Sequence, residues 1–251
     1  MILLDGKTLS QKILSSLVIT PNLSLHVILV GNDPSSLKYV DLKQKKCQEI
    51  GIKCIVHHLE SSVSESVLLK LINQLNRQSN VTGFFIQLPL PANFDNSKIL
   101  QAINPLKDVD GLNPDSKIFP AVVNGIISLL DEYQINLSGK NVVIINDSQL
   151  IGQPLKSLFE KRHALVTLGN KDTACLSAIT SEADILISAT GVKNLITADM
   201  VKSGAVVIDV AGGDVDFADV APKCSYITPT FGGVGPMTVA SLLQSLTKIN
   251  H

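Results

Sequence analysis

Regular alternation of strand-like and helix-like segments is the feature that most restricts what this chain can fold into. Short apolar runs such as 26–30 and 83–88 are separated by stretches with the apolar spacing of an amphipathic helix, such as 64–75. Strands that alternate with helices form parallel sheets with both faces covered. We therefore predict an α/β protein. Ligands of such sheets bind beyond the carboxyl ends of the strands, where 31–34 and 87–91 would share a cleft.

A turn-rich segment divides this pattern into two series. Residues 104–120 contain Asn-Pro, Asp-Gly and further proline turns with little apolar sequence, which indicates a domain boundary and a cleft loop. The second series begins with a strand at 141–145, a helix at 151–160 and a strand at 165–167. Strand, turn, helix and strand in this order is the pattern of a nucleotide-binding domain.

Composition excludes several classes of partner. No apolar run in the 251 residues approaches the roughly 20 needed to cross a bilayer, and the N-terminal segment with Asp5 does not resemble a signal peptide. A formal net charge of −1 gives no electrostatic footprint for nucleic acid. The four cysteines show no CxxC spacing and the five histidines no HExxH motif. We therefore predict a cytoplasmic protein that does not bind a membrane, nucleic acid or a metal ion and has no disulfide framework.

Residues 25–47 contain the most suggestive single side chain. A strand is followed by a Gly-Asn-Asp-Pro turn and a helix whose N-terminus Ser35 and Ser36 could cap. Lys43 lies in the apolar stripe of this helix, four residues after Tyr39 and on the same face. A buried amine would have a lowered pKa and could carry a proton. The alternative, favoured by the helix pattern alone, is that the lysine follows the stripe outward and reaches solvent.

Polar residues also follow other strands. Gln87 ends an apolar strand before a Leu-Pro-Leu-Pro exit, so its amide could face a ligand or satisfy its own loop. Asp108 and Asp110 could accept hydrogen bonds from a ligand or make Asx turns, which is the commoner use. Two carboxylates with no histidine or third acid nearby do not indicate a metal site.

The turn after the strand at 141–145 is unusual for one that binds phosphate. It has a single glycine, Gly152, where the usual fingerprint has three. Asn146 tolerates a positive φ, so the turn can still form. Asp147, however, places a negative charge where a phosphate would lie, against the attraction of the helix N-terminus. Local chemistry alone predicts a poor phosphate site.

Taken together, these segments resemble the methylenetetrahydrofolate dehydrogenase/methenyltetrahydrofolate cyclohydrolase family over nearly the whole chain. The matching segments are 3–7, 30–36 with 39–40 and 43, 87–91, 107–111, 204–210, 227–229 and 232–239. The resemblance implies an N-terminal α/β catalytic domain that binds folate, at 1–119 with the helix 236–251. It also implies a Rossmann-like parallel-sheet nucleotide domain at 120–235, with a cleft between the two. One-carbon derivatives of tetrahydrofolate are the implied substrates, and a homodimer is the implied assembly.

The family pattern gives individual residues a role. Lys43 would be the catalytic group, Gln87 would hold its protonation state, and Tyr39 would stack on the pterin, which makes these three the predicted catalytic residues. Asp110 would bind the pterin ring. The resemblance therefore reverses the preference for a solvent-reaching Lys43. The predicted substrate-binding residues are Tyr39, Val40, Lys43, Ile86, Gln87, Leu88, Asp110, Gly232, Gly233, Val234, Gly235, Pro236 and Thr238.

The nucleotide half departs from the family pattern. Asn146-Asp147-Ser148 stands where the family has Gly-Arg-Ser, whose arginine pairs with the 2′-phosphate of NADP, and a loop is shortened around 211–213. The predicted cofactor-binding residues, for NADP or NAD, are Asn146, Asp147, Ser148, Ile151, Gly152, Lys171 and Gly212. Because of Asp147, we expect the dinucleotide site to be weakened or lost, and NAD to fit better than NADP.

The expected function is the hydrolysis of 5,10-methenyltetrahydrofolate to 10-formyltetrahydrofolate, with the NAD(P)-dependent oxidation of 5,10-methylenetetrahydrofolate in question. One alternative is a fully bifunctional dehydrogenase/cyclohydrolase. Another, from a different class, is a non-catalytic folate-binding protein that regulates an active paralogue. The presence of Tyr39, Lys43, Gln87 and Asp110 together argues against this last alternative.

Overall fold

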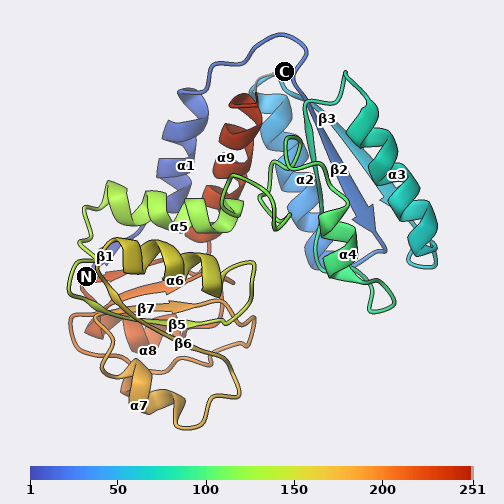
Figure 1. The fold of residues 1–251 in the computed structure, drawn as a ribbon. Coiled ribbons are helices and arrows are strands. Elements are labelled where there is room, and N and C mark those ends of the chain that lie inside the picture. Colours follow the sequence, from blue (N-terminus) through green and yellow to red (C-terminus); the bar gives the residue numbers. More distant parts are fainter. Residues whose placement is uncertain (250–251) are drawn as a thin grey trace. The chain divides into compact units, whose positions relative to one another are not determined.

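The computed structural model describes residues 1–249, which form two compact units (Figure 1). One unit joins Ile13–Ala121 to the described part of 241–251, and the other joins Met1–Lys12 to Val122–Ala240. Met1–Lys12 belongs to the second unit, because β1 (Ile2–Leu3) pairs with β9 (Tyr226–Ile227).

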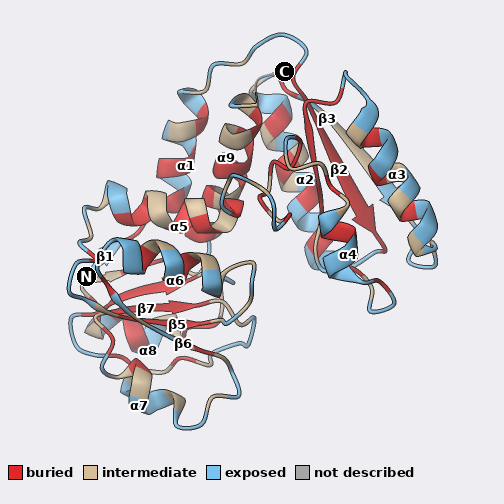
Figure 2. Ribbon diagram, in the orientation of Figure 1, coloured by how far each residue is buried: buried red, intermediate tan, exposed pale blue. Residues whose placement is uncertain are grey.

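The first unit is built on a parallel sheet with the strand order β3-β2-β4. Its central strand, β2, is buried along its whole length, as expected when both faces of a parallel sheet are covered (Figure 2). Figure 1 shows α2 and α3 flanking the sheet, and α3 buries Leu68, Ile72 and Leu75. The elements are β2 (Ser24–Val30), α2 (Pro34–Glu49), β3 (Lys53–Leu59), α3 (Glu65–Arg77), β4 (Gly83–Ile86) and α4 (Asn96–Gln101).

The start of α2 differs from the prediction. Its N-cap is Asp33, whose side chain accepts a hydrogen bond from the backbone N–H of Ser36 at 2.7 Å. The predicted cap by the hydroxyls of Ser35 and Ser36 is therefore wrong. An aspartate is as good an N-cap as serine, and proline at the first helical position fixes the helix start one residue earlier than the serines.

The second unit contains a parallel sheet with the strand order β1-β9-β8-β7-β5-β6. Its elements are α1 (Gly6–Ser15), which begins in it, α5 (Ala121–Glu132), β5 (Asn141–Ile145), α6 (Gly152–Lys161), β6 (Leu165–Gly169), α7 (Leu176–Thr180), β7 (Ile185–Ser188), η1 (Ala198–Met200), β8 (Val206–Asp209), α8 (Phe217–Val220), η2 (Ala221–Lys223) and α9 (Val234–Thr247), which ends in the first unit. No helix within residues 1–249 is both long and apolar enough to span a membrane.

Period-two alternation along the strands builds the core of the second unit. Val143, Leu186 and Val207 belong to one buried cluster, against which Leu176 and Ile179 of α7 pack. β5 and β6 are neighbours in the sheet, and their last residues, Ile145 and Gly169, lie opposite each other. The turns that follow these two strands therefore emerge side by side at the carboxyl edge of the sheet.

Candidate functional site

Lys43 is buried in the three-stranded unit, with 4% of its surface exposed. Its Nζ donates a hydrogen bond to Oε1 of Gln87 at 3.1 Å and lies 3.9 Å from the centroid of the Phe85 ring. Because Phe85 is in β4 and Gln87 follows it, the lysine side chain from α2 points to the carboxyl end of the sheet. The alternative in which the side chain reaches solvent is therefore wrong.

The surroundings of Lys43 shift its pKa and that of Asp110 in opposite directions. Burial lowers the pKa of Lys43 because it disfavours the ammonium form, and the attraction of Asp110 opposes this shift. Burial likewise raises the pKa of Asp110, against the attraction of Lys43 and a hydrogen bond from the backbone of Ala121. Both groups are moved toward the neutral pH range, where a proton can be taken up and released.

The two ends of the Gln87 amide have separate partners. Its Nε2 donates a hydrogen bond to the carbonyl oxygen of Leu88 at 2.7 Å, and its Oε1 accepts from Lys43. The sequence left open whether this amide faces a functional group or satisfies its own loop. The structure shows that it does both, because the bond to Leu88 fixes the amide so that its oxygen faces the lysine.

Asp108 and Asp110 have different functions in the same loop. The Asp108 carboxylate is 2% exposed and accepts hydrogen bonds from the backbone N–H groups of Asp110, Gly111 and Asn113. Asp108 therefore makes the predicted Asx-type turn. The neighbouring Asp110 is only half-buried and, of the two, is the carboxylate that acts electrostatically on Lys43.

An Asp108→Ala variant should lose about 3 kcal/mol of stability, because three backbone donors would be left without their acceptor, two of them in buried surroundings. Urea unfolding followed by circular dichroism measures this loss. Asp115→Ala is the matched control, since Asp115 is an exposed carboxylate in the same loop. Equal unfolding midpoints for the two variants would contradict the assigned role of Asp108.

The other predicted substrate-binding residues fall into two groups. In the three-stranded unit, Val40 and Ile86 are buried, Leu88 is half-buried, and Tyr39 is exposed on α2. The segment 232–238 belongs to the six-stranded unit, at the start of α9. Gly232 accepts a hydrogen bond from the backbone N–H of Lys7 at 2.8 Å. A Cβ on Gly6 would lie 1.9 Å from the carbonyl oxygen of Gly233, so these glycines allow the two backbones to approach closely.

The turn between β5 and α6 is organised by the side chain of Asn146. Its Oδ1 accepts hydrogen bonds from the backbone N–H groups of Ser148 and Gly152 and from the Ser148 hydroxyl, and its Nδ2 donates to Ala189. The N–H of Ile151 bonds the Ser148 hydroxyl in turn. A Cβ on Gly152 would lie 1.8 Å from the Asn146 carbonyl oxygen. The turn thus has the tight strand-to-helix packing on which a dinucleotide pyrophosphate rests, with one glycine and an asparagine in place of three glycines.

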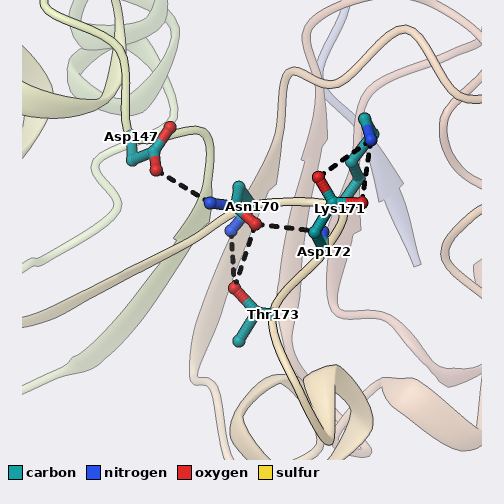
Figure 3. A network of polar contacts seen from close by, with 5 residues as sticks. All are labelled: Asp147, Asn170, Lys171, Asp172 and Thr173. Atoms are coloured by element: carbon teal, nitrogen blue, oxygen red, sulfur yellow. Dashed lines mark hydrogen bonds and ion pairs between the residues drawn. The ribbon is translucent and has the colours of Figure 1, made fainter.

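The remaining predicted cofactor residues have partners that the sequence did not reveal. Asp147 is exposed and accepts a hydrogen bond from Nδ2 of Asn170 at 2.8 Å (Figure 3). Lys171 Nζ lies 2.8 and 2.9 Å from the two carboxylate oxygens of Asp172. Asn170 and Asp172 were missed as candidates, although side chains after the second strand of such a domain commonly contact the adenosine ribose.

Gly212 lies in the shortened loop after β8. Its backbone N–H donates a hydrogen bond to Asp209 at 2.8 Å, and its φ of 76° is in the region that favours glycine. The N–H groups of Gly213 and Val215 bond the same carboxylate, so Asp209 fixes the short loop. The structure gives Gly212 a clear role in the backbone of this loop.

No group of three or more His, Cys, Asp or Glu side chains within residues 1–249 is placed to hold a metal ion. A cavity of about 510 Å³ lies at the amino ends of β2 and β3, where Ser24, His26 and Lys53 line it. None of the residues that line this cavity is among the predicted site residues, because those follow the opposite, carboxyl ends of the strands. Lys43 and Gln87 meet at these carboxyl ends, apart from the cavity.

Comparisons with known proteins agree with this arrangement. Residues 4–110 match the family model described as the tetrahydrofolate dehydrogenase/cyclohydrolase catalytic domain, and residues 120–251 match its NAD(P)-binding domain. The bifunctional protein FolD of Wolinella succinogenes is 46% identical over 98% of this chain and 96% of its own length. The FolD crystal structure from Campylobacter jejuni is 41% identical, with a TM-score of 0.92 over 99% of this chain and 98% of that chain. Trypanosoma brucei FolD, complexed with NADP and an inhibitor, is 28% identical, with a TM-score of 0.91 over 98% of this chain and 95% of that chain.

These comparisons confirm the two-domain α/β fold and do not bear out the expectation of a weakened or lost dinucleotide site. The domain that matches residues 120–251 is an NAD(P)-binding domain. That expectation relied on the missing glycines and on the charge of Asp147. In the structure, the Asn146 side chain forms the turn without those glycines, and the Asp147 carboxylate accepts a hydrogen bond from Asn170. On both family models and on a 46% identical relative, this chain belongs to the tetrahydrofolate dehydrogenase/cyclohydrolase family.

Proposed function

We propose that the chain is bifunctional. It oxidises 5,10-methylenetetrahydrofolate with a nicotinamide dinucleotide and hydrolyses the resulting 5,10-methenyltetrahydrofolate to 10-formyltetrahydrofolate. The observation that carries this proposal is the buried Lys43–Gln87 pair beside Asp110, in a chain whose relatives are bifunctional FolD proteins. Residues 1–119 with 236–251 bind the folate in this proposal, and residues 120–235 bind the dinucleotide.

In the proposed hydrolysis, Lys43 moves protons between water and the substrate. Water adds to the cationic carbon that bridges N5 and N10, and the lysine amine accepts the proton that the water releases. The bond from that carbon to N5 then breaks, and the lysine ammonium returns its proton to N5. The hydroxyl group on the carbon loses its proton to water as the formyl C=O forms. One proton is released overall as the cation becomes neutral 10-formyltetrahydrofolate. The lowered pKa of Lys43 keeps its neutral form accessible for the first step.

Gln87 and Asp110 hold the participants in place. The Gln87 oxygen accepts from Lys43 Nζ, so it orients the amine toward the carboxyl end of β4, where substrate binds. The half-buried carboxylate of Asp110 accepts hydrogen bonds from N–H groups of the pterin. Tyr39, exposed on α2, offers a ring for stacking, and 232–238 contributes further substrate contacts.

The six-stranded unit fits the dinucleotide. Asn146, Ser148, Ile151 and Gly152 form the turn that would hold the pyrophosphate, because Gly152 leaves no Cβ in the way of close backbone packing. Asp147, Lys171 and Gly212 lie on the same carboxyl edge of the sheet. When bound, the nicotinamide supplies the hydride acceptor for the methylene carbon.

The proposed setting is a homodimer in the cytoplasm. β3 is an edge strand of its sheet, and edge strands present backbone groups to which a second chain can bind. Cys47, Cys54, Cys175 and Cys224 are all free, as is usual in a reducing compartment.

Spectroscopic assays of the purified chain test the proposed function. With 5,10-methylenetetrahydrofolate and either NAD or NADP, methenyltetrahydrofolate absorbance should appear. With 5,10-methenyltetrahydrofolate alone, the same absorbance should decay faster than in a blank without protein. Hydrolysis without oxidation by either dinucleotide would overturn the bifunctional assignment. Folate binding without turnover in both assays would instead support a non-catalytic regulatory protein.

A further inference from the structure

A side-chain bridge joins the two turns at the dinucleotide edge of the six-stranded sheet. Asp147 follows β5, Asn170 follows β6, and the Asn170 amide donates a hydrogen bond to the Asp147 carboxylate at 2.8 Å (Figure 3). Asn170 is itself fixed, because its backbone N–H bonds the Thr173 hydroxyl and its Oδ1 accepts from the backbone N–H of Asp172. The Asp147 carboxylate is therefore directed toward the turn that follows the neighbouring strand.

The position of this bridge relates it to one part of a dinucleotide. In a parallel nucleotide-binding sheet, the pyrophosphate lies over the turn after the first strand. The adenosine ribose is contacted by a side chain roughly 20 residues further on, after the second strand. Asp147 and Asn170 are 23 residues apart and occupy these two turns. The bridge thus joins the pyrophosphate turn to the turn from which a side chain reaches the ribose. It brings the Asp147 carboxylate toward the 2′ substituent of the ribose, which is a hydroxyl in NAD and a phosphate in NADP.

The charges in these turns favour the 2′-hydroxyl of NAD over the 2′-phosphate of NADP. Asp147 and Asp172 are carboxylates, and the ammonium of Lys171 is already bonded to both oxygens of Asp172. The arginines of the chain are elsewhere: Arg77 is in α3, and Arg162 pairs with Asp131. Lys193 follows β7, which is separated from β6 by β5. A 2′-phosphate, with a charge of roughly −1.5 to −2 at neutral pH, would meet a net negative group of side chains.

We propose that Asp147, positioned by Asn170, selects NAD over NADP. The carboxylate accepts a hydrogen bond from the ribose 2′-hydroxyl and repels a 2′-phosphate. This inference rests on the proposed function, in which residues 120–235 bind a dinucleotide, and it adds which dinucleotide is used.

Equilibrium binding to the full-length protein tests the selectivity. The chain contains no tryptophan, so titrations with NADH and NADPH can be followed by nicotinamide fluorescence, and NAD and NADP by calorimetry. We expect the non-phosphorylated dinucleotides to bind about ten- to a hundredfold more tightly. This gap should narrow as salt is raised, because a repulsion between exposed charges is screened and a steric exclusion is not.

Substitutions separate the charge of Asp147 from its orientation. Asp147→Asn should reduce the NAD preference by about tenfold, and Asp147→Arg should reverse it. Asn170→Ala keeps the charge but frees the carboxylate, so affinity for NAD should fall while NADP stays excluded. Glu182→Gln is the control. It removes one negative charge from an exposed residue before β7, at the amino edge of the same sheet, and should leave the ratio unchanged.

The binding results distinguish a failure of NAD selectivity from a failure of the proposed dehydrogenase function. NADP binding as tightly as NAD, or a ratio that changes equally in Asp147→Asn and Glu182→Gln, would overturn the selectivity role of Asp147 alone. If neither dinucleotide binds the unmodified protein, the dehydrogenase half of the proposed function fails together with the inference.

Discussion

A Lys43→Met protein should hydrolyse 5,10-methenyltetrahydrofolate about a thousandfold more slowly than the unmodified protein, yet fold normally. Methionine retains the length of the lysine stem and can pack on the Phe85 ring, against which Nζ now lies at 3.9 Å. It removes the group that exchanges protons with water and substrate. Single-turnover measurement of methenyltetrahydrofolate decay would give the loss in the chemical step, separated from substrate binding.

Lys45→Met is the control for this variant. Lys45 is on the same helix but exposed, where it pairs with Asp41 at 2.7 Å, so its replacement should leave turnover within about twofold and stability nearly unchanged. Retained hydrolysis in Lys43→Met, or an equal loss in Lys45→Met, would remove Lys43 from the mechanism.

The same variant should change how stability depends on pH. Burial lowers the pKa of Lys43 in the folded protein, whereas the unfolded chain keeps a value near 10.4. Between these two values the unfolded chain binds a proton that the folded chain has lost, so the contribution of Lys43 to stability rises with pH. Lys43→Met should lack this rise and be more stable than the unmodified protein at lower pH. Denaturant midpoints measured from neutral pH to about pH 10 test the sign.

Replacement of Gly152 by alanine should have the second large effect. It should lower the free energy of unfolding by about 3 kcal/mol and weaken dinucleotide binding. The added Cβ would lie 1.8 Å from the carbonyl oxygen of Asn146 and 3.1 Å from the Cα of Asp147, and both are backbone atoms that cannot rotate away. Alanine gains at most about 1 kcal/mol in helix propensity over glycine, which does not offset the clash. The turn between β5 and α6 must therefore shift.

Two measurements check this variant. The denaturant midpoint should fall, and calorimetric titration should show dinucleotide affinity reduced by at least about tenfold, or 1.4 kcal/mol. Gln153→Ala, at the next and exposed position of α6, should leave both quantities near those of the unmodified protein. A Gly152→Ala protein with unchanged midpoint and affinity would show that the turn tolerates a side chain there.

The helix pattern located Lys43 on the apolar face of α2 but could not show how deeply its side chain is buried. The burial depends on β4, which pairs with β2 and places Phe85 and Gln87 next to the lysine. Likewise, the local sequence identified Asp147 as a charge in a phosphate-binding turn. Its partner Asn170 could not be found locally, because the contact depends on β5 and β6 being neighbours in the sheet. Family resemblance supplied the residue types of the site, and strand order supplied their contacts.

Two local features of the fold also depend on contacts that the local sequence does not show. β1 is too short to show a strand pattern, and it exists because Ile2 and Leu3 pair with Tyr226 and Ile227 at the far end of the chain. The cap of α2 was misassigned because aspartate and serine are equally good caps, so only the hydrogen bond to Ser36 identifies Asp33.

The pairing of β1 with β9 has a consequence for the order in which the protein is made. A ribosome releases the chain at about 5–20 residues per second from its N-terminus, so β1 emerges long before its partner strand exists. The unit that contains Ile13–Ala121 also draws on residues after 240, including Leu246, whose side chain lies close to Gly83. Translation must therefore pass β9 and the first half of α9 before the six-stranded unit has all its parts, and must continue beyond Ala240 for the other unit. The nascent chain completes both units at nearly the same time, and neither one can serve as a finished template for the other.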